Sequence, residues 1–547
     1  MKLSALALDY DGTIAVDGVL EPSVRDAIAD ARRRGIVVVL VTGRQVSDLR
    51  RVAGDLTCFD VVVAENGAVL DFPASGRHVL LTHQPNAAFV DELRRCGARA
   101  TVGEAIVETD GTSAAATLEV LRRLEQPLVL LFNRGQLMVL PQAIAKSTGL
   151  RQALAALRIS IHNTLAIGDA ENDHDLIDAC EVGVAVAWGS RTLRAAADEV
   201  IEGTDPRAVA QYIRRVSRQP RLSAAQMGRH RLPLGHEHNG DAVSLAVRGR
   251  TVFIAGEPGT GKSWLAGLLC EQLILQGYCV CVLDPEGDYR SLETLPGVAV
   301  LGGDDLPPGA RELLKALRHP DVSVVVDLSK ISHRQKVEYL NTLLPLLIAM
   351  RRRTGLPHKI LLDEAHYYLG RSDSGHLVDP EFAGYIFVTY RISGLAPSIR
   401  SSPDAVVMVT RETDPFEAET LLRMCRPMPH DVGPAIFTDL ATNEAALLPG
   451  AEESHGQVRR FRLAPRLTSH VRHQVKYLDM PVLNQHAFVF SDHGTRGPTA
   501  HTLKEFTGLL AALPSERIRG HFQRHDFSRW LADVFRDHPL ASRVREL

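Results

Sequence analysis

Closely spaced cysteine pairs are missing from this sequence. Its seven cysteines are scattered over 547 residues, and none shows the C-x-x-C spacing of a zinc or redox site. Cys279 and Cys281 flank a single residue of an expected strand, which favours two buried thiols over metal ligands. Such usage is typical of a reducing compartment, so we expect a cytoplasmic protein.

Long apolar runs and a strong net charge are missing as well. No segment reaches the roughly 20 apolar residues that a membrane-spanning helix needs. Asp9 and Asp11 interrupt the apolar N-terminal run, which therefore does not predict a signal peptide. The formal net charge of −3 gives no overall attraction to nucleic acid or to a membrane. We expect no membrane partner.

One stretch near the middle of the chain carries the pattern of a phosphate-binding loop. Residues 256–263 are G-x-x-x-x-G-K-S, after a β-branched run at 251–255 and before a helical pattern at 264–276. Glycines let backbone N–H groups approach phosphate oxygens, and the following helix presents its positive end to the same anion. The pattern predicts an ATP site in which Lys262 contacts the β- and γ-phosphates and Ser263 binds Mg²⁺. The expected nucleotide-binding residues of this loop are Gly256, Gly259, Thr260, Gly261, Lys262 and Ser263.

An acidic pair follows a later apolar strand. Residues 359–362 run directly into Asp363 and Glu364. In a P-loop ATPase the first carboxylate holds the water shell of Mg²⁺ and the second activates the attacking water, so we assign these roles to Asp363 and Glu364. An acidic helix cap is the alternative. Arg411 follows a strand expected at 405–410, where it could reach the nucleotide of a neighbouring subunit.

The second half of the chain resembles the HerA/FtsK-type ATPases over about residues 232–462. The segments that carry the resemblance are the P-loop, D-P-E-G-D-Y at 284–289, D-E-A-H at 363–366, and the strands expected at 385–389 and 405–410. The resemblance implies a RecA-like sheet, ATP hydrolysis and a homo-oligomer, since related ATPases build rings.

Two departures count against DNA pumping. Tyr390 and Arg391 stand where many relatives carry a glutamine that senses the γ-phosphate. Only a short expected hairpin precedes the P-loop, where DNA-translocating relatives carry a larger barrel. A nucleic-acid partner is therefore not favoured.

Paired carboxylates follow the first apolar strand, expected at 3–8. They belong to the sequence D-Y-D-G-T at 9–13. Residues two apart in a strand point to the same side, so Asp9 and Asp11 project together from the carboxyl end of the strand. Open α/β sheets bind ligands at this edge. Two adjacent carboxylates repel each other unless a cation or a proton intervenes. A solvated turn fits this segment alone equally well.

Three later segments complete an ordered pattern with D-Y-D-G-T. They are Thr42-Gly43-Arg44 after a strand at 36–41, Lys146 at a helix start after a strand at 136–140, and Gly168 to Asp173 after a strand at 165–167. Together they resemble the four motifs of the haloacid dehalogenase superfamily of phosphohydrolases. The E-N-G-A segment at 65–68 resembles its Cof-type branch. This resemblance implies a Rossmann-like core, an inserted α/β cap that chooses the substrate, and a requirement for Mg²⁺.

The resemblance implies a role for each motif residue, and the chemistry of each side chain agrees. Asp9 would attack phosphorus and form an aspartyl-phosphate. Asp11 would protonate the leaving alcohol and then activate water. Thr42 would hydrogen-bond the phosphoryl oxygens, and Lys146 would offset their charge. The expected oxygen ligands of Mg²⁺ are Asp9, Asp11, Asp169 and Asp173.

Two groups of histidines elsewhere are weaker indications of a site. His230, His236 and His238 cluster around the end of the expected linker, where a polar turn is favoured over a metal site because no carboxylate or cysteine is spaced with them. His521 and His525 share a helix face if one helix spans both, and helix-end hydrogen bonding is favoured over a zinc pair. The surrounding C-terminal segment resembles an accessory domain without assigned chemistry, and we expect an interaction or packing module.

These patterns predict a multidomain α/β protein with two hydrolytic sites. The expected boundaries are a phosphatase at 1–215 with a core at 1–68 and 144–215 and a cap at 69–143, a linker at 216–231, an ATPase at 232–465, and a small mostly helical domain at 466–547. Within the cap, strands are expected at 101–108, 128–133 and 136–140, and within the ATPase a long helix is expected at 337–352. The predicted function is Mg²⁺-dependent hydrolysis of a small phosphorylated metabolite, with a sugar phosphate as one candidate, fused to an ATP-hydrolysing module. The alternatives are a bifunctional metabolite kinase and phosphatase, and a nucleic-acid-associated motor with a phosphatase domain.

Overall fold

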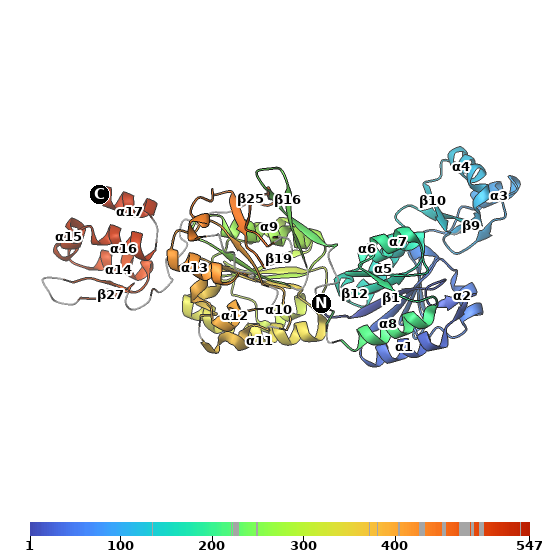
Figure 1. Cartoon of the computed structure of the whole chain (residues 1–547), viewed down its shortest axis with the longest axis horizontal. Coiled ribbons are helices and arrows are strands. Elements are labelled where there is room, and N and C mark those ends of the chain that lie inside the picture. The colour runs from blue at the N-terminus through green and yellow to red at the C-terminus, as the bar shows by residue number, and fades with distance from the viewer. Residues whose placement is uncertain are drawn as a thin grey trace.

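The computed structural model arranges the chain as three parts in a row (Figure 1). The first domain runs from β1 to α8, the second from β15 to β25, and the C-terminal domain from β26 to α17. None of the described helices combines the length and apolar character needed to cross a bilayer. The structure describes residues 1–547 except 134, 220, 223–228, 248–249, 371, 380, 403–404, 426–432, 451–453, 455, 470–481, 483–485, 492–496 and 536–537.

The first domain is built on an eight-stranded sheet whose central strands are parallel. Its strands lie in the order β14 (Glu199–Ile201), β13 (Val182–Val186), β12 (Thr164–Gly168), β1 (Ala5–Asp9), β4 (Val37–Val41), β5 (Val61–Ala64), β6 (Val69–Phe72) and β7 (Arg77–Leu80). β1 pairs with both β12 and β4, so that Ala5 lies opposite Thr164 and Val37. This places the carboxyl ends of the motif-bearing strands at one edge.

Helices cover both faces of this sheet, which explains why its central strands are apolar throughout. The helices are α1 (Pro22–Arg33), α2 (Val46–Ala53), α5 (Lys146–Ala156), α6 (His174–Ala179), α7 (Arg191–Ala196) and α8 (Pro206–Ser217), and a small hairpin joins β2 (Ala15–Val16) to β3 (Val19–Leu20). Leu6 and Leu8 of β1 pack into the same core as α1 and α8. Ala5 and Ala7 pack on the other face with α5, α6 and α7. Figure 1 shows these two helix layers below and above the sheet.

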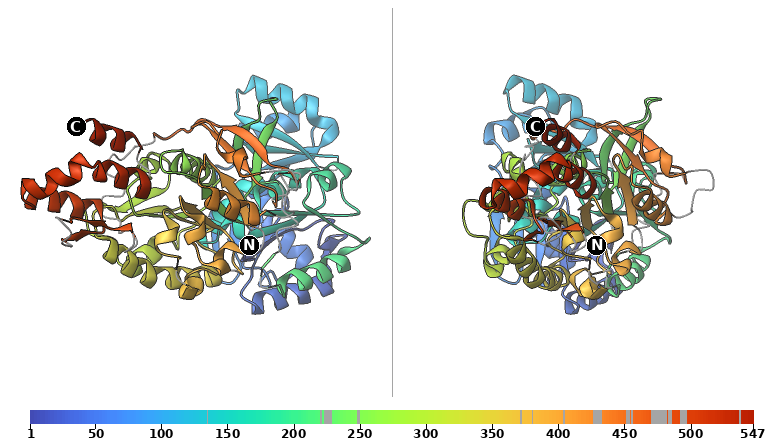
Figure 2. Two further views of the ribbon diagram at one scale, coloured as in Figure 1. Left: turned by 60° about the vertical axis from the view of Figure 1, so that its left-hand side comes forward. Right: turned by 90° about the vertical axis from the view of Figure 1, so that its left-hand side faces the viewer.

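The cap begins later than residue 69, where the sequence placed its start. β6 and β7 are antiparallel strands that extend the first sheet, and Leu70 of β6 is buried in its core. The cap sheet has the order β10 (Leu128–Asn133), β11 (Gln136–Pro141), β9 (Val107–Asp110) and β8 (Thr101–Val102). Helices α3 (Ala87–Arg95) and α4 (Ala114–Arg123) complete the cap and stand above the first domain in both views of Figure 2.

The single cap strand expected at 101–108 is two strands, β8 and β9, joined by a turn. The backbone N–H groups of Glu104, Ala105 and Ile106 donate to the Glu65 carboxylate at 2.8, 2.8 and 3.1 Å. Glu65 lies in the core segment η1 (Glu65–Gly67). A turn rather than a continuous strand results because these N–H groups point to a core side chain and not to a neighbouring strand.

The second domain contains an eleven-stranded sheet with the P-loop strand near its centre. Its order is β16 (Ala242–Ala246), β15 (Arg231–His236), β25 (Arg459–Leu463), β24 (Glu444–Leu447), β23 (Ala405–Val409), β17 (Thr251–Ala255), β22 (Tyr385–Thr389), β21 (Lys359–Leu362), β18 (Val280–Asp284), β20 (Ser323–Asp327) and β19 (Val298–Gly302). From β23 to β19 all pairings are parallel, and from β16 to β24 they are antiparallel. The helices are α9 (Lys262–Leu275), α10 (Ala310–Ala316), α11 (His333–Thr354), α12 (Pro397–Arg400) and α13 (Pro415–Arg423).

The helix expected at 337–352 is longer in the structure. α11 begins one turn earlier because Ser332 caps it, accepting a bond from the Gln335 backbone N–H. It ends at Gly355, which adopts a left-handed conformation with φ of 80°. The expected linker at 216–231 begins inside α8, and its residues 220 and 223–228 lie outside the described part of the chain.

The C-terminal domain packs four helices over a two-stranded ribbon. Its elements are β26 (Phe488–Val489), β27 (Thr499–Ala500), α14 (Leu503–Ala512), α15 (Ser515–Gln523), α16 (Asp526–Val534) and α17 (His538–Glu546). His521 and His525 do not share a helix face, because one helix does not span both residues. His525 has φ of 56° between α15 and α16, and His521 lies 2.8 Å from the Asp526 carboxylate instead. Phe488, Phe506 and Trp530 belong to the aromatic core of this domain.

Candidate active sites

Three buried carboxylates meet at the carboxyl edge of the first sheet. Asp9 ends β1, and Asp169 follows the neighbouring parallel strand β12. One ligand atom from each of Asp9, Asp169 and Asp173 lies within 4.8 Å of the others. The Lys146 ammonium, at the start of α5, lies 2.6 Å from Asp9 Oδ1 and 2.6 Å from Asp173 Oδ1. The structure thus brings together four of the residues that the motifs predicted.

The electrostatics of this cluster favour a bound cation. Burial raises the pKa of Asp9 well above its ordinary value, the charge of Asp173 adds to this, and Lys146 opposes it. Burial alone would lower the pKa of Lys146, but the Asp173 and Asp9 carboxylates outweigh burial and raise it. Three carboxylates against one ammonium leave negative charge in excess. Carboxylate oxygens are the ligands that Mg²⁺ prefers, so Asp9 and Asp169 fit a magnesium ion.

Asp173 also braces the loop that carries Asp169. Its Oδ2 accepts bonds from the backbone N–H groups of Asp169 and Ala170, each at 3.0 Å. Gly168 is required here, since a Cβ at this position would lie 2.6 Å from the Cβ of Asp173. Asp173 therefore fixes both the loop and Lys146, in addition to its place in the carboxylate cluster.

Asp11 lies outside the carboxylate cluster, although the sequence grouped it with the metal ligands. Its carboxylate pairs with Arg44, whose Nε and Nη2 lie 2.6 and 2.8 Å from the two oxygens. Arg44 Nη1 lies 2.5 Å from Asp48. Thr42 is buried, and its hydroxyl accepts a bond from the Arg44 backbone N–H at 3.1 Å. The catalytic roles of Asp11 and Thr42 stay predictions.

These site residues, with the exception of Asp173, line a pocket of about 660 Å³ between the core and the cap. Core residues Asp9, Thr42 and Lys146 line it together with Glu108 and Met138 of the cap. Burial raises the pKa of Glu108, and the nearby Glu65 adds to this. The sequence did not single out Glu108 or Arg44 as site residues. Only the position of Arg44, directly after Thr42-Gly43, could have indicated it.

The P-loop of the second domain has the backbone shape that its glycines predict. Gly256, Gly259 and Gly261 have φ values of 143°, 76° and 107°. A Cβ on Gly256 would lie 2.2 Å from the hydroxyl of Thr410, the residue after β23, so only glycine fits at this point of the loop. Lys262 donates to the backbone carbonyl of Glu257 at 2.7 Å.

Ser263 and Asp288 form a contact that the sequence did not predict. The Ser263 hydroxyl donates to Asp288 Oδ2 at 3.0 Å. Asp288 belongs to the D-P-E-G-D-Y segment, which folds around Asp284. The Asp284 carboxylate accepts bonds from the backbone N–H groups of four residues, Glu286, Gly287, Asp288 and Tyr289. Asp288 therefore joins Ser263 as a candidate for the Mg²⁺ environment of this site.

The acidic pair after β21 is fully buried. Asp363 Oδ1 accepts a bond from the Glu364 backbone N–H at 2.9 Å. Glu364 has φ of 48° and ψ of 42°, a left-handed conformation that costs of order 1–3 kcal/mol in a residue other than glycine. Such strain clusters at functional sites. Glu364 directly precedes the short helix η7 (Ala365–Tyr367), but its side chain makes no capping hydrogen bond to that helix, which counts against the acidic helix cap considered above.

His366 lies close to Glu364, with Nδ1 at 3.8 Å from Oε2. The same Nδ1 pairs with the Thr389 hydroxyl at 2.9 Å. Burial lowers the pKa of His366 well below its ordinary value, and the charges of Arg391 and Lys262 add to this. The Tyr390 ring lies 4.4 Å from the His366 ring. His366, Thr389 and Tyr390 thus occupy the end of β22, where the sequence found no sensor glutamine.

Arg411 lies at the surface beside the P-loop. Its side chain is 52% exposed, with Nε at 3.8 Å from Glu257 Oε2. Its backbone carbonyl accepts a bond from the Glu257 N–H at 2.9 Å. The contact of Arg411 with a neighbouring subunit stays a prediction.

Comparison with known proteins matches two separate parts of the chain to two family models. The family model described as haloacid dehalogenase-like hydrolase matches residues 6–111 and 97–213. Residues 6–213 form a haloacid dehalogenase-like hydrolase domain. The model described as the central domain of helicase HerA matches residues 247–344, which include the P-loop and end before Asp363.

Similar proteins with curated names include two phosphatases. Phosphoglycolate phosphatase of Methanothermobacter thermautotrophicus is 29% identical over 223 residues, covering 39% of this chain and 98% of that relative. Phosphoglycolate phosphatase 2 of Saccharolobus solfataricus is 26% identical over 221 residues, covering 39% and 91%. A solved haloacid dehalogenase-like hydrolase from Bacteroides thetaiotaomicron is 20% identical with a TM-score of 0.36, covering 39% of this chain and all of that one.

Proposed function

We propose that the first domain is a Mg²⁺-dependent phosphomonoesterase for a small phosphorylated metabolite. The observation that carries this proposal is the Asp9, Asp169 and Asp173 cluster, held by Lys146 on the wall of a pocket between core and cap. Mg²⁺ held by Asp9 and Asp169 would neutralise charge on the phosphoryl oxygens.

The chain's own residues account for the chemistry of transfer. Asp9 attacks phosphorus and forms the P–O bond of an aspartyl-phosphate as the bond to the leaving alcohol breaks. Asp11 gives the alcohol its proton and later takes one from the attacking water, which requires its carboxylate to exchange Arg44 for substrate. Lys146 offsets the charge on the transferring group, and Thr42 donates to its oxygens.

A small anionic substrate fits the pocket best. Arg44 and Arg51 line it beside the cap, and guanidinium groups bind carboxylate and phosphate oxygens well. The phosphoglycolate phosphatases named above act on a substrate of this class. We therefore place phosphoglycolate beside sugar phosphates as a candidate.

A substrate panel tests this function. Phosphoglycolate, sugar phosphates, nucleotides and an aryl phosphate are incubated with the full chain and Mg²⁺, and released phosphate is measured. We expect turnover of at least one small phosphomonoester and a fall of orders of magnitude in Asp9→Asn, which keeps the shape and loses the nucleophile. Equal turnover by Asp9→Asn would reject the assignment.

We propose that the second domain binds and hydrolyses ATP, on the support of the P-loop, the Ser263–Asp288 contact and the buried Asp363–Glu364 pair. Glu364→Gln keeps the size of the side chain and removes the base. ATP hydrolysis should fall at least ~10²-fold while ATP binding persists. Hydrolysis at the wild-type rate, with labelled phosphate transferred to a metabolite, would favour the kinase alternative.

The match to helicase HerA supports a second candidate for the work of this ATPase, a motor that acts on nucleic acid. Salt-sensitive DNA binding and DNA-stimulated ATP hydrolysis are expected for such a motor. An ATPase rate unchanged by DNA at low salt would exclude it. Light scattering with and without ATP tests the proposed homo-oligomer, and Arg411→Ala should weaken ATP-dependent assembly or turnover.

A further inference from the structure

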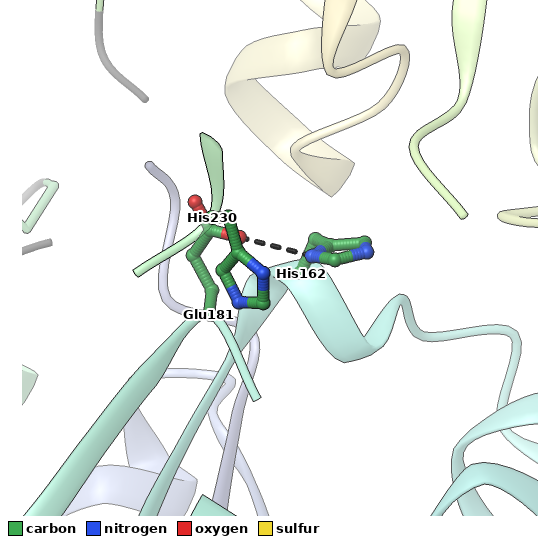
Figure 3. Close-up of side chains that lie close together, drawn as sticks. All are labelled: His162, Glu181 and His230. Atoms are coloured by element: carbon green, nitrogen blue, oxygen red, sulfur yellow. Dashed lines mark hydrogen bonds and ion pairs between the residues drawn. The ribbon is translucent and has the colours of Figure 1, made fainter. Parts of the chain in front are cut away.

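The histidines around the expected linker do not gather where the sequence placed them. His238 lies on the surface of the second domain, 3.1 Å from Glu444. His230, just before β15, instead approaches two buried residues of the first domain, His162 and Glu181. One ligand atom from each of these three residues lies within 4.8 Å of the others, and Figure 3 shows them converging.

The hydrogen bonds of both imidazoles leave one nitrogen of each for a metal. His162 Nε2 lies 2.8 Å from the backbone carbonyl of Gln276, and His230 Nε2 lies 3.1 Å from that of Cys180. A carbonyl oxygen can only accept, so each Nε2 carries its hydrogen. A neutral ring then has its lone pair on Nδ1. Metal-binding histidines usually donate their other N–H to a carbonyl or carboxylate in this way.

Glu181 completes the set as an oxygen ligand. His162 Nδ1 lies 2.9 Å from Glu181 Oε2, and the Tyr278 hydroxyl donates to the same oxygen at 2.7 Å. The Tyr278 ring also stacks on His162, with centroids 3.7 Å apart. Tyr278 thereby fixes the carboxylate and one imidazole together.

The cluster joins the two domains. His162 and Glu181 belong to the first domain, whereas Gln276 and Tyr278 follow α9 of the second. A cavity of about 200 Å³ lies beside the cluster, lined by His162, Glu181 and Tyr278 among others, and gives an ion a route of entry.

We propose that His162, Glu181 and His230 bind a zinc ion that fastens the first domain to the second. Two imidazoles and one carboxylate are ligands that suit Zn²⁺, and Mg²⁺ prefers oxygen ligands alone. Three protein ligands leave a fourth coordination position for water. The competing arrangement is a metal-free pair in which a doubly protonated His162 donates to Glu181 and Gln276.

Zinc stoichiometry separates these arrangements. The full chain carrying Asp9→Asn, which weakens any binding at the carboxylate cluster, is stripped with a chelator and titrated with Zn²⁺ alone against a chromophoric competitor. We expect one tight zinc per chain, lost or weakened at least about tenfold by His230→Gln and by Glu181→Gln. His238→Gln is the matched control and should bind as the parent does. Absence of tight zinc binding by the parent would overturn the site. The same conclusion would follow if His230→Gln, shown by circular dichroism to be folded, bound zinc as tightly as the parent.

Calorimetry tests the fastening role. With zinc the first and second domains should unfold in one transition, and after chelation in two. The His230→Gln variant should show two transitions in both conditions. A thermogram that zinc does not change in the parent would show that the ion does not join the domains.

Discussion

At the scale of single residues, buried charge is the feature that most constrains this chain. The Asp9 and Asp173 carboxylates share the Lys146 ammonium, so both of these buried carboxylates contact a group of opposite charge. Lys359 is different. It is buried at the start of β21, and its ammonium donates to the backbone carbonyl of Val247. Burial lowers the pKa of Lys359 to about 7, although the negative charge of Glu181 acts to raise it.

Lys359 therefore predicts a pH-dependent stability. Between about pH 7 and its ordinary pKa of 10.5, the unfolded chain holds a proton that the folded chain has released. Stability should rise with pH across this window, by up to about 1.4 kcal/mol for each unit of pKa shift. Thermal unfolding of the wild type is compared with Lys359→Met from pH 7 to 10, with the exposed Lys330→Met as control. A difference between wild type and Lys359→Met that does not change with pH would contradict the assignment.

Site residues next to strand ends could be predicted from sequence, because a motif at a strand end in a parallel sheet has only one edge to occupy. Asp9, Asp169 and Asp363 are of this kind. Contacts made across the fold could not be predicted from the sequence. The pairing of Arg44 with Asp11 and of Ser263 with Asp288 depends on how loops close over the sheet edge. The meeting of His162 with His230 depends on how two domains dock.

At the scale of elements, the Glu65 segment links the core to the cap. Its carboxylate receives three backbone N–H groups from the turn between β8 and β9, and so fixes the cap strands that bear Thr101 and Glu108 over the pocket. The side-chain amide of a glutamine would direct its own N–H donors at these backbone N–H donors. Glu65→Gln should therefore raise KM for the phosphomonoester more than it lowers kcat, with a loss of about 1–3 kcal/mol of stability.

Glu104→Gln is the matched control for Glu65→Gln. Glu104 lies in the same turn, but its side chain is exposed and contacts His78. Steady-state kinetics and thermal unfolding of both variants are compared. Wild-type KM and stability in Glu65→Gln would show that the cap does not depend on this link.

Elements set by local patterns were predicted well, and elements set by tertiary contacts were not. The strands β17, β21 and β22 have the residues expected for them, because each is a short apolar run between polar or turn residues. The strand expected at 101–108 was wrong because Glu65 draws its middle into a turn. The cap start at 69 was wrong because the apolar residues of β6 suit a strand of the core sheet as well as a cap strand.

At the scale of the whole molecule, the two proposed metals have different ligand chemistry. Chelation should abolish phosphatase activity, and Mg²⁺ should restore it. Zn²⁺ should substitute poorly, because the Asp9 and Asp169 ligands are hard oxygens that suit an octahedral ion. Phosphate release is measured after stripping and after adding back each metal separately. Full activity in the stripped chain would contradict the magnesium site.

The two proposed reaction centres lie in separate domains. The centre in the first domain would hydrolyse a phosphomonoester, and the centre in the second domain would hydrolyse ATP. The account predicts that they can be disabled independently. Asp9→Asn removes the nucleophile at the end of β1, and Lys262→Ala removes the phosphate-binding ammonium at the start of α9.

The most direct measurement follows aryl phosphate hydrolysis and ATP hydrolysis side by side in the wild type and in these two variants. Asp9→Asn should lose aryl phosphate hydrolysis by orders of magnitude and keep ATP hydrolysis, and Lys262→Ala should do the reverse. Intact aryl phosphate hydrolysis in Asp9→Asn, with ATP hydrolysis unchanged, would contradict the central assignment of the first domain.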